Sequence, residues 1–198
     1  MGTGRLEAFS DGVIAIIITI MVLELHAPEQ PTWAALRLLL PKFLAYVLSF
    51  VYVGIYWNNH HHLLRITPRV SGGVLWANLN LLFWLSLIPF TTAWAGEHYH
   101  DSIPAALYGV VLLAAAIAYW LLQCSILSVI GRDSDLGRAL GTDWKGKLSP
   151  LLYAIGVGMS FVSVWIAQIL FAAVAAIWFV PDRRIERQII GHSGPSAE

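Results

Sequence analysis

The sequence predicts an all-α integral membrane protein, and three observations lead to that class. Hydrophobic residues make up 58% of the 198 residues and charged residues only 12%, about half of what soluble domains carry. The apolar residues gather in long runs, several of which approach the roughly 20 residues that a helix needs to cross a bilayer. The few lysines and arginines lie near the ends of these runs, which excludes a basic nucleic-acid-binding face.

The first span, from about Leu6 to Leu25, is the most informative stretch of the chain. Its apolar run over residues 13–23 is interrupted only by Thr19 and closes at Glu24. Asp11 lies just inside the opposite end, where a carboxylate is costly unless it is paired or faces water. Capping of the helix start is a simpler role for the same carboxylate.

A helical wheel separates two kinds of surface on this first span. Gly12, Ile16, Thr19 and Leu23 fall within a narrow stripe, with Ile20 at its edge. Small residues form a flank that permits close helix contact, namely Gly12, Ala15 and Thr19. A helix surrounded by lipid would need neither the acid nor the small flank. We therefore expect the first helix to line a surface that it shares with other helices.

Three further long spans follow. The second runs from about Leu36 to Asn59, with Pro41 in its first turn or at a kink. The third runs from about Val74 to Ala95, and the fourth from about Ile103 to Ile130. Pro89 is expected to kink the third span. The single cysteine, Cys124, excludes a disulfide within the chain, and we expect its side chain to be buried.

The last apolar region, residues 148–180, is too long for one straight helix across a bilayer. We expect two short helices of roughly 15 to 17 residues each, the lower end of what crosses, with a break near residues 163–165. A polar loop over residues 131–147 precedes them. The chain is therefore expected to form a single six-helix transmembrane domain over residues 1–190, with a disordered tail over 191–198.

The distribution of basic residues supports six spans with both termini in the cytoplasm. With that topology only Arg37 and Lys42 lie outside, and the other ten of the twelve lysines and arginines lie inside, as the positive-inside rule requires. The expected location is the cell membrane, as a multi-pass protein. No internal duplication is visible, so symmetry has to come from assembly of several subunits.

The residues at the start of the first span resemble a known signature. Arg5-x-x-x-Phe-Ser-Asp11, followed by Gly-Val-x-Ala-Ile-x-Ile-Thr-x-x-Val-Leu-Glu24, is similar to the first helix of the transmembrane protein 175 family. Members of that family are potassium-permeable channels of bacteria, archaea and animal lysosomes. The six-helix repeat and the chain length agree with bacterial members.

The resemblance implies a homotetramer in which the first helices of four copies line a central pore. The matching pore residues are Ile16, Ile20 and Leu23, to which Thr19 adds a ring of hydroxyls. The chain has no Thr-Val-Gly-Tyr-Gly-type segment, so a carbonyl filter cannot form. An apolar constriction should select potassium over sodium only modestly, because sodium holds its water more tightly. Glu24 at the outer mouth and Asp11 at the inner mouth would concentrate cations.

The resemblance also implies a polar network around the Phe-Ser-Asp segment. Three adjacent histidines on a helix point about 100° apart, a poor arrangement for binding one metal ion together. We therefore expect no metal at His60-His61-His62. Instead we expect one of them, with Trp57 or Asn78, to hydrogen-bond Asp11 or Arg5, and the spacing does not select which. The residues assigned to this structural or gating network are Arg5, Phe9, Ser10, Asp11, Trp57, His60, His61 and Asn78.

Other functions fit the sequence less well. The chain has no glycine-rich phosphate loop, no His-Glu-x-x-His and no serine elbow, which argues against an enzyme. A proton-conducting channel or a secondary cation transporter is the alternative, although carriers usually show repeats. A purely structural membrane protein would leave Asp11 and Glu24 unexplained. The expected partners are potassium ions, the lipid bilayer and further copies of the chain, with no cofactor and no nucleic acid.

Overall fold

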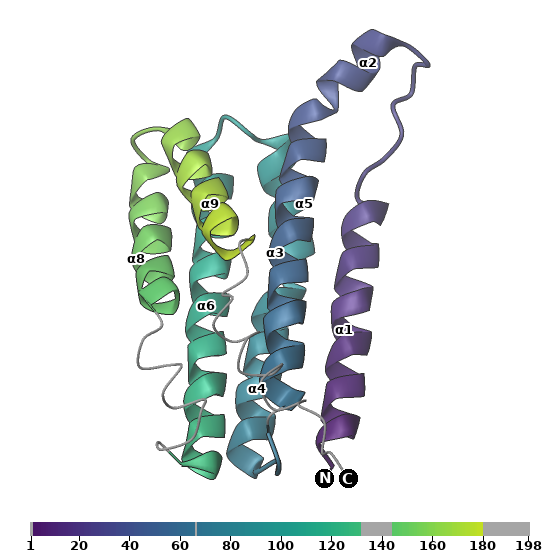
Figure 1. The fold of residues 1–198 in the computed structure, drawn as a ribbon. Helices are drawn as coiled ribbons and strands as arrows, with labels where there is room; N and C mark the ends of the chain where they lie inside the picture. The colour runs from purple at the N-terminus through teal and green to yellow at the C-terminus, as the bar shows by residue number, and fades with distance from the viewer. Residues whose placement is uncertain (1, 66, 132–143, 180–198) are drawn as a thin grey trace, which may run out of the picture.

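The computed structural model describes residues 2–65, 67–131 and 144–179, and within these ranges the chain is helical without strands (Figure 1). The helices are α1 (Thr3–Leu23), α2 (Trp33–Leu38), α3 (Leu40–Arg65), α4 (Gly72–Ser86), α5 (Ile88–Glu97), α6 (Ser102–Ile130), α8 (Trp144–Met159) and α9 (Val164–Phe179). The polar loop and the tail expected over 131–147 and 191–198 lie mostly or wholly outside the described residues.

Four helical segments of the described chain are long and apolar enough to cross a membrane. They are α1, α3, the continuous stretch of α4 and α5, and α6, and α9 is a shorter apolar helix. The long helices stand side by side, with α1 at one edge and the pair α8 and α9 toward the other (Figure 1). The short helix α2 projects beyond one end of the bundle and buries none of its residues.

Prolines shape the second and third spans in the expected places. Pro41 is the second residue of α3, a position where the missing N–H leaves no bond unmade. Pro89 cannot donate to the carbonyl of Leu85, and the helical stretch pauses at Leu87 between α4 and α5. The third span is therefore interrupted where the sequence predicts a kink.

The last apolar region forms two helices, α8 and α9, of 16 residues each. The break lies at Ser160–Ser163, just before the expected position, and the Ser160 hydroxyl donates to the Gly156 carbonyl at 3.0 Å. The prediction placed Trp144–Lys147 in a loop, whereas these residues form the first turn of α8. This first turn is polar, but it leads directly into the apolar run of α8, and the helix forms through both.

Two further expectations need correction. The second span does not end at Asn59, because α3 continues to Arg65 and carries all three histidines on a helix. Nothing in the polar run before Pro68 breaks a helix. Cys124 is exposed rather than buried, since a membrane helix is apolar all round and its composition does not say which side packs inward.

The interior consists of two apolar clusters that share α3, α5 and α6. One joins α1, α3, α4, α5 and α6, with the fully buried Leu64, Leu81 and Leu122 among its members. The other joins α3, α5, α6, α8 and α9 around Phe171. Helix α1 packs on α3, α4 and α5, so the second cluster supports it only indirectly.

Phe171 is seated in a slot made by two glycines. An added Cβ at Gly109 of α6 or at Gly156 of α8 would overlap the Phe171 ring. Tyr108 packs edge-on against the same ring at 5.8 Å between centroids, and the Tyr52 hydroxyl donates to the Phe171 carbonyl. Helices α6, α8 and α9 can approach this closely only because both sites lack a side chain.

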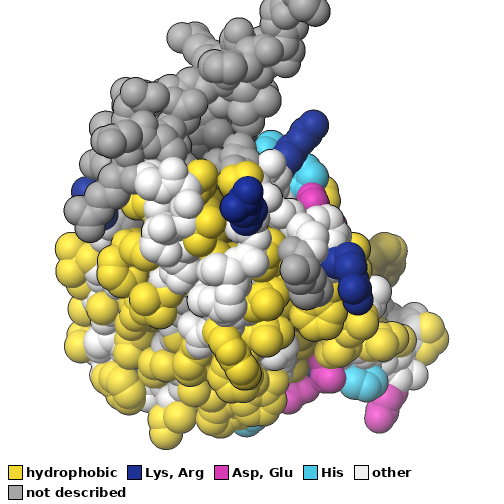
Figure 2. Space-filling view, turned by 90° about the horizontal axis from the view of Figure 1, so that it is seen from below, with side chains coloured by type: hydrophobic (Ala, Val, Ile, Leu, Met, Phe, Trp, Pro, Cys, Tyr) yellow, Lys and Arg dark blue, Asp and Glu magenta, His cyan; other side chains and the backbone are white. Residues whose placement is uncertain are grey.

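The end of the bundle near the N-terminus carries basic side chains. Figure 2 views this end and shows lysine and arginine side chains over an otherwise largely hydrophobic surface. Arg5 begins α1, Arg65 ends α3 and Arg69 precedes α4, which places all three at this end. Arg37 and Lys42 belong to α2 and the start of α3, at the opposite end. The basic residues of the described chain thus separate as the sequence predicts.

Gly156→Ala should lower the stability of the folded subunit by about 1–3 kcal/mol, because the methyl group overpacks the Phe171 slot. Gly158→Ala is the matched control, since a Cβ there meets nothing within 4 Å and alanine favours a helix more than glycine does. Thermal unfolding of both variants in detergent measures the difference. Equal melting temperatures for the two variants would contradict the slot.

Candidate functional site

Helix α1 has one buried face and one exposed face, and the two differ in chemistry. The buried face recurs every three to four residues, at Leu6, Ser10, Ile14, Ile17 and Met21. It packs against α3, α4 and α5. Ser10 is its single polar member and lies near the start of the helix, so the rest of the face is held by apolar contact alone.

The exposed face carries large apolar side chains in one stripe. Ile16 is 58% exposed, Ile20 42% and Leu23 73%, and Phe9 at 50% extends the stripe toward the start of the helix. None of the three predicted pore residues is packed inside its own subunit. Thr19 is exposed beside them, and its hydroxyl donates to the Ile16 carbonyl at 2.8 Å. The oxygen of that hydroxyl keeps its acceptor capacity toward the exposed side.

A chain of buried hydrogen bonds ties the start of α1 to α4 and α3. The Ser10 hydroxyl donates to the Leu6 carbonyl at 2.8 Å, and the Asn78 amide nitrogen donates to the Ser10 oxygen at 3.0 Å. The His60 Nε2 lies 2.6 Å from the Asn78 Oδ1. Ser10, Asn78 and His60 are each 0% exposed. In a membrane interior such groups have few other partners, so their pairing fixes how the three helices sit.

Two less deeply buried contacts flank this chain of hydrogen bonds. The Trp57 indole N–H donates to the Asp11 carboxylate at 3.0 Å. The His61 Nδ1 lies 2.7 Å from the Glu7 carboxylate, and the His61 ring stacks on Trp57 with 6.2 Å between centroids. The acid inside the first span is therefore paired with a side chain of α3. Of the three histidines, His60 and His61 bond to side chains of α4 and α1.

The structure brings together most of the predicted network but not all of it. Within the described chain, no hydrogen bond or ion pair joins Arg5 to Asp11. Arg5 and Phe9 are exposed and lie on the same side of α1 as Ile16, each about 20° away from it on the wheel. Glu7 was not predicted. Its position one turn before Asp11, opposite a helix end rich in histidine, is the signal that could have found it.

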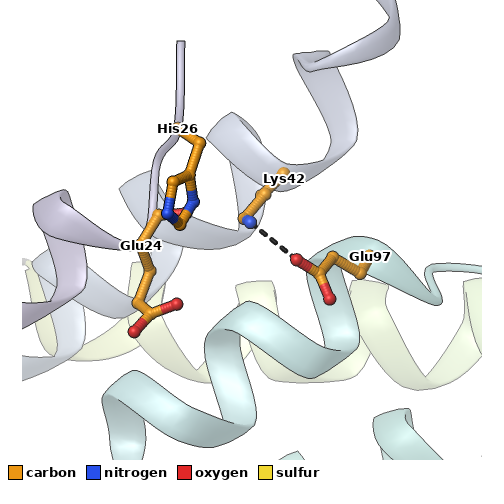
Figure 3. A network of polar contacts seen from close by, with 4 residues as sticks. All are labelled: Glu24, His26, Lys42 and Glu97. Atoms are coloured by element: carbon orange, nitrogen blue, oxygen red, sulfur yellow. Dashed lines mark hydrogen bonds and ion pairs between the residues drawn. The ribbon is translucent and has the colours of Figure 1, made fainter. Parts of the chain in front are cut away.

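The other end of α1 carries charge beside an ion pair. Figure 3 shows Glu24, His26, Lys42 and Glu97 close together, and the Lys42 ammonium bonds Glu97 rather than Glu24 at 2.8 Å. The His26 Nδ1 lies 3.1 Å from the backbone carbonyl of Glu24. The Glu24 carboxylate has no ion pair within the described residues. It follows directly on the exposed stripe, at the C-cap of α1.

The described residues contain no group of three or more His, Cys, Asp and Glu side chains placed to hold a metal. What they contain is a helix that presents a bulky apolar stripe outward, with carboxylates near both of its ends. The fold and this site define an α-helical integral membrane protein whose first helix is anchored on one side and, among the described residues, unpartnered on the other.

Comparisons with known proteins identify the family. The family model described as the endosomal/lysosomal potassium channel TMEM175 matches residues 5–89. A potassium channel of Chryseobacterium sp. (strain P1-3) is 51% identical over 189 residues, covering 96% of this chain and 98% of that protein. The crystal structure of a lysosomal potassium-selective channel TMEM175 homolog from Chamaesiphon minutus superposes with a TM-score of 0.81 at 30% identity, covering 90% of this chain and 96% of that one. The chain belongs to the TMEM175 family, whose members are ion channels and not enzymes.

Replacing Asn78 by leucine should destabilise the subunit by about 1–3 kcal/mol, because the His60 N–H loses its acceptor in a buried setting. Asn80→Leu is the control on the same helix. Asn80 is half-buried and makes no hydrogen bond with the described residues, so the same change there should cost little. Unfolding of the two variants in detergent, followed by circular dichroism, gives the comparison. A similar loss for both would remove Asn78 from the anchoring role.

Proposed function

We propose that the protein is a potassium-permeable, modestly potassium-selective channel whose narrowest part is built from the first helix of each subunit. The observation that carries the proposal is the exposed stripe of Ile16, Ile20 and Leu23 on a helix anchored from its other side. The relatives from Chryseobacterium and Chamaesiphon minutus are named potassium channels, which supports potassium as the permeant ion.

The proposed pore contains successive apolar rings. At 1.5 Å of rise per residue, Ile16 and Leu23 are about 10 Å apart along α1, with Ile20 between them. Each ring gates by narrowing or by loss of water. A cation that passes must give up part of its hydration, and the Thr19 hydroxyls replace some of it. Because sodium holds its water more tightly, potassium passes with the smaller loss.

The proposed assembly is a homotetramer with six membrane-spanning helices per subunit. Helices α8 and α9 complete the six, although at 16 residues each they reach only about 24 Å. Both termini are placed in the cytoplasm, because the basic residues gather at the N-terminal end of the bundle. Several copies are needed, since the described residues of one subunit leave the Ile16, Ile20 and Leu23 stripe exposed. The mass of the complex in detergent tests whether it contains four subunits.

Ile16→Asn should raise potassium flux several-fold in proteoliposomes and reduce the preference for potassium over sodium, because a polar ring wets the constriction. Ile169→Asn is the control, an isoleucine on α9 that is 67% exposed and remote from α1. Flux under potassium and sodium gradients, with membrane voltage set by ionophores, measures both effects. If the two variants behave alike, or if wild-type flux saturates as in a carrier, the pore assignment is wrong.

Glu24→Gln should lower potassium flux at low ionic strength and leave it nearly unchanged at about 1 M salt, where the Debye length is about 3 Å. The physical reason is that a ring of carboxylates at the mouth concentrates cations. Glu97→Gln is the control, since the Glu97 charge is already paired with Lys42. A salt-independent effect of Glu24→Gln would argue for a structural role instead.

Proton conduction is the second candidate function. The human relative is named an endosomal/lysosomal proton channel and is 41% identical over 83 residues, which is 34% of this chain and 16% of that protein. Carboxylates near both ends of α1 would also concentrate protons. The same proteoliposomes, loaded with a pH-sensitive dye and given a proton gradient, separate the two activities.

A further inference from the structure

His60 is buried completely, yet one of its two ring nitrogens has no partner. The ring lies between α1, α3 and α4 and is 0% exposed. Its Nε2 contacts Asn78, whereas its Nδ1 makes no hydrogen bond within the described residues. A buried polar atom without a partner is uncommon in proteins and calls for an explanation.

The hydrogen-bond directions determine the form of this ring. Ser10 gives its hydrogen to the Leu6 carbonyl, so its oxygen accepts from the Asn78 NH₂ group. Asn78 therefore turns its oxygen toward His60, and the His60 Nε2 must carry a hydrogen. In its neutral form this ring therefore has a bare Nδ1, which is the atom that takes up a second proton.

The titratable side chains that act on His60 come from α1 and α3. Glu7 and Asp11 of α1 and His61 of α3 are the titratable neighbours that act on the ring, and Asn78 of α4 is a neutral amide. The two carboxylates lie one turn apart on α1. At present Glu7 bonds His61 and Asp11 bonds Trp57. Both acids belong to the helix whose position the network sets.

We propose that His60 is a proton-binding site that couples pH at the inner end of α1 to the position of this helix. A proton on Nδ1 converts this unpartnered acceptor atom into a hydrogen-bond donor, and the His60 ring becomes positively charged near the carboxylates of Glu7 and Asp11. The imidazolium attracts Asp11 and Glu7, weakens the Trp57–Asp11 bond and shifts the start of α1 relative to α3. Proton binding needs only the folded subunit, whereas its effect on ion flux rests on the proposed channel function.

Nitrogen-15 NMR of histidine-labelled protein in liposomes tests proton binding directly. Well above the ordinary histidine pKa of about 6.5, His60 should show the neutral tautomer with hydrogen on Nε2. Well below that value it should show the imidazolium signal, and His60→Gln should remove both signals. A ring that stays neutral through the whole titration would overturn the proposal, whether or not the protein conducts potassium.

Potassium flux at varied inner pH tests the coupling. Wild-type flux should change about fivefold or more across the titration, the usual range of coupling between sites. His60→Gln keeps a donor toward Asn78 but cannot bind a proton, so its flux should not vary with inner pH. His98→Gln, which alters an exposed histidine after α5 at the opposite end of the bundle, should keep the wild-type dependence. Asn78→Asp should move the transition to higher pH, since a carboxylate there favours the imidazolium.

Two results of the flux experiment would overturn the coupling. One is a pH dependence in His60→Gln equal to that of the wild type. The other is a dependence that disappears in His98→Gln and persists in His60→Gln. If the wild-type protein carries no potassium at all, the proposed function fails, and the NMR titration still decides whether His60 binds a proton.

Discussion

The position of α1 depends on the buried hydrogen bonds from Leu6 through Ser10 and Asn78 to His60. Apolar contact alone positions a membrane helix weakly, because lipid chains are as apolar as the partner side chains. A buried chain of directed hydrogen bonds restricts these helices to few arrangements. It also sets the rotation of α1 about its axis. A rotation that broke the Ser10–Asn78 bond would move every apolar side chain between Ser10 and the end of the helix.

One consequence is the division of α1 into an anchored face and an unpartnered face. Ile14, Ile17 and Met21 are buried because Ser10 sets the rotation, and Ile16, Ile20 and Leu23 are exposed for the same reason. A single subunit in a membrane would leave that stripe against lipid. Helices from further copies would cover it and create a shared surface, which connects the network at one end of α1 with the proposed constriction.

Much of the fold could be predicted from hydrophobic runs, prolines and charge, because those signals are local. The four long spans, the interruption before Pro89 and the division of the last apolar region into α8 and α9 are of this kind. Outside the first span, the side of each helix that packs inward could not be predicted, as the exposed Cys124 of α6 illustrates. The resemblance around Phe9-Ser10-Asp11 limited the expected partners of Asp11 to a few side chains. The choice of Trp57, and the pairing of Glu7 with His61, depend on how α1 and α3 are rotated against each other.

The segment matched by the family model, residues 5–89, contains α1, α3 and α4, and with them the whole network and the exposed stripe. Helices α6, α8 and α9 lie outside it and build the second core around Phe171. Helix α1 packs on α3, α4 and α5, so the second core influences α1 only through these helices. One such link is the hydrogen bond that the Tyr52 hydroxyl of α3 donates to the Phe171 carbonyl of α9. The Phe171 slot therefore supports α3, and α3 carries Trp57, His60 and His61. The proposed movement of α1 would then act through the polar contacts at its inner end, where its carboxylates meet side chains of α3.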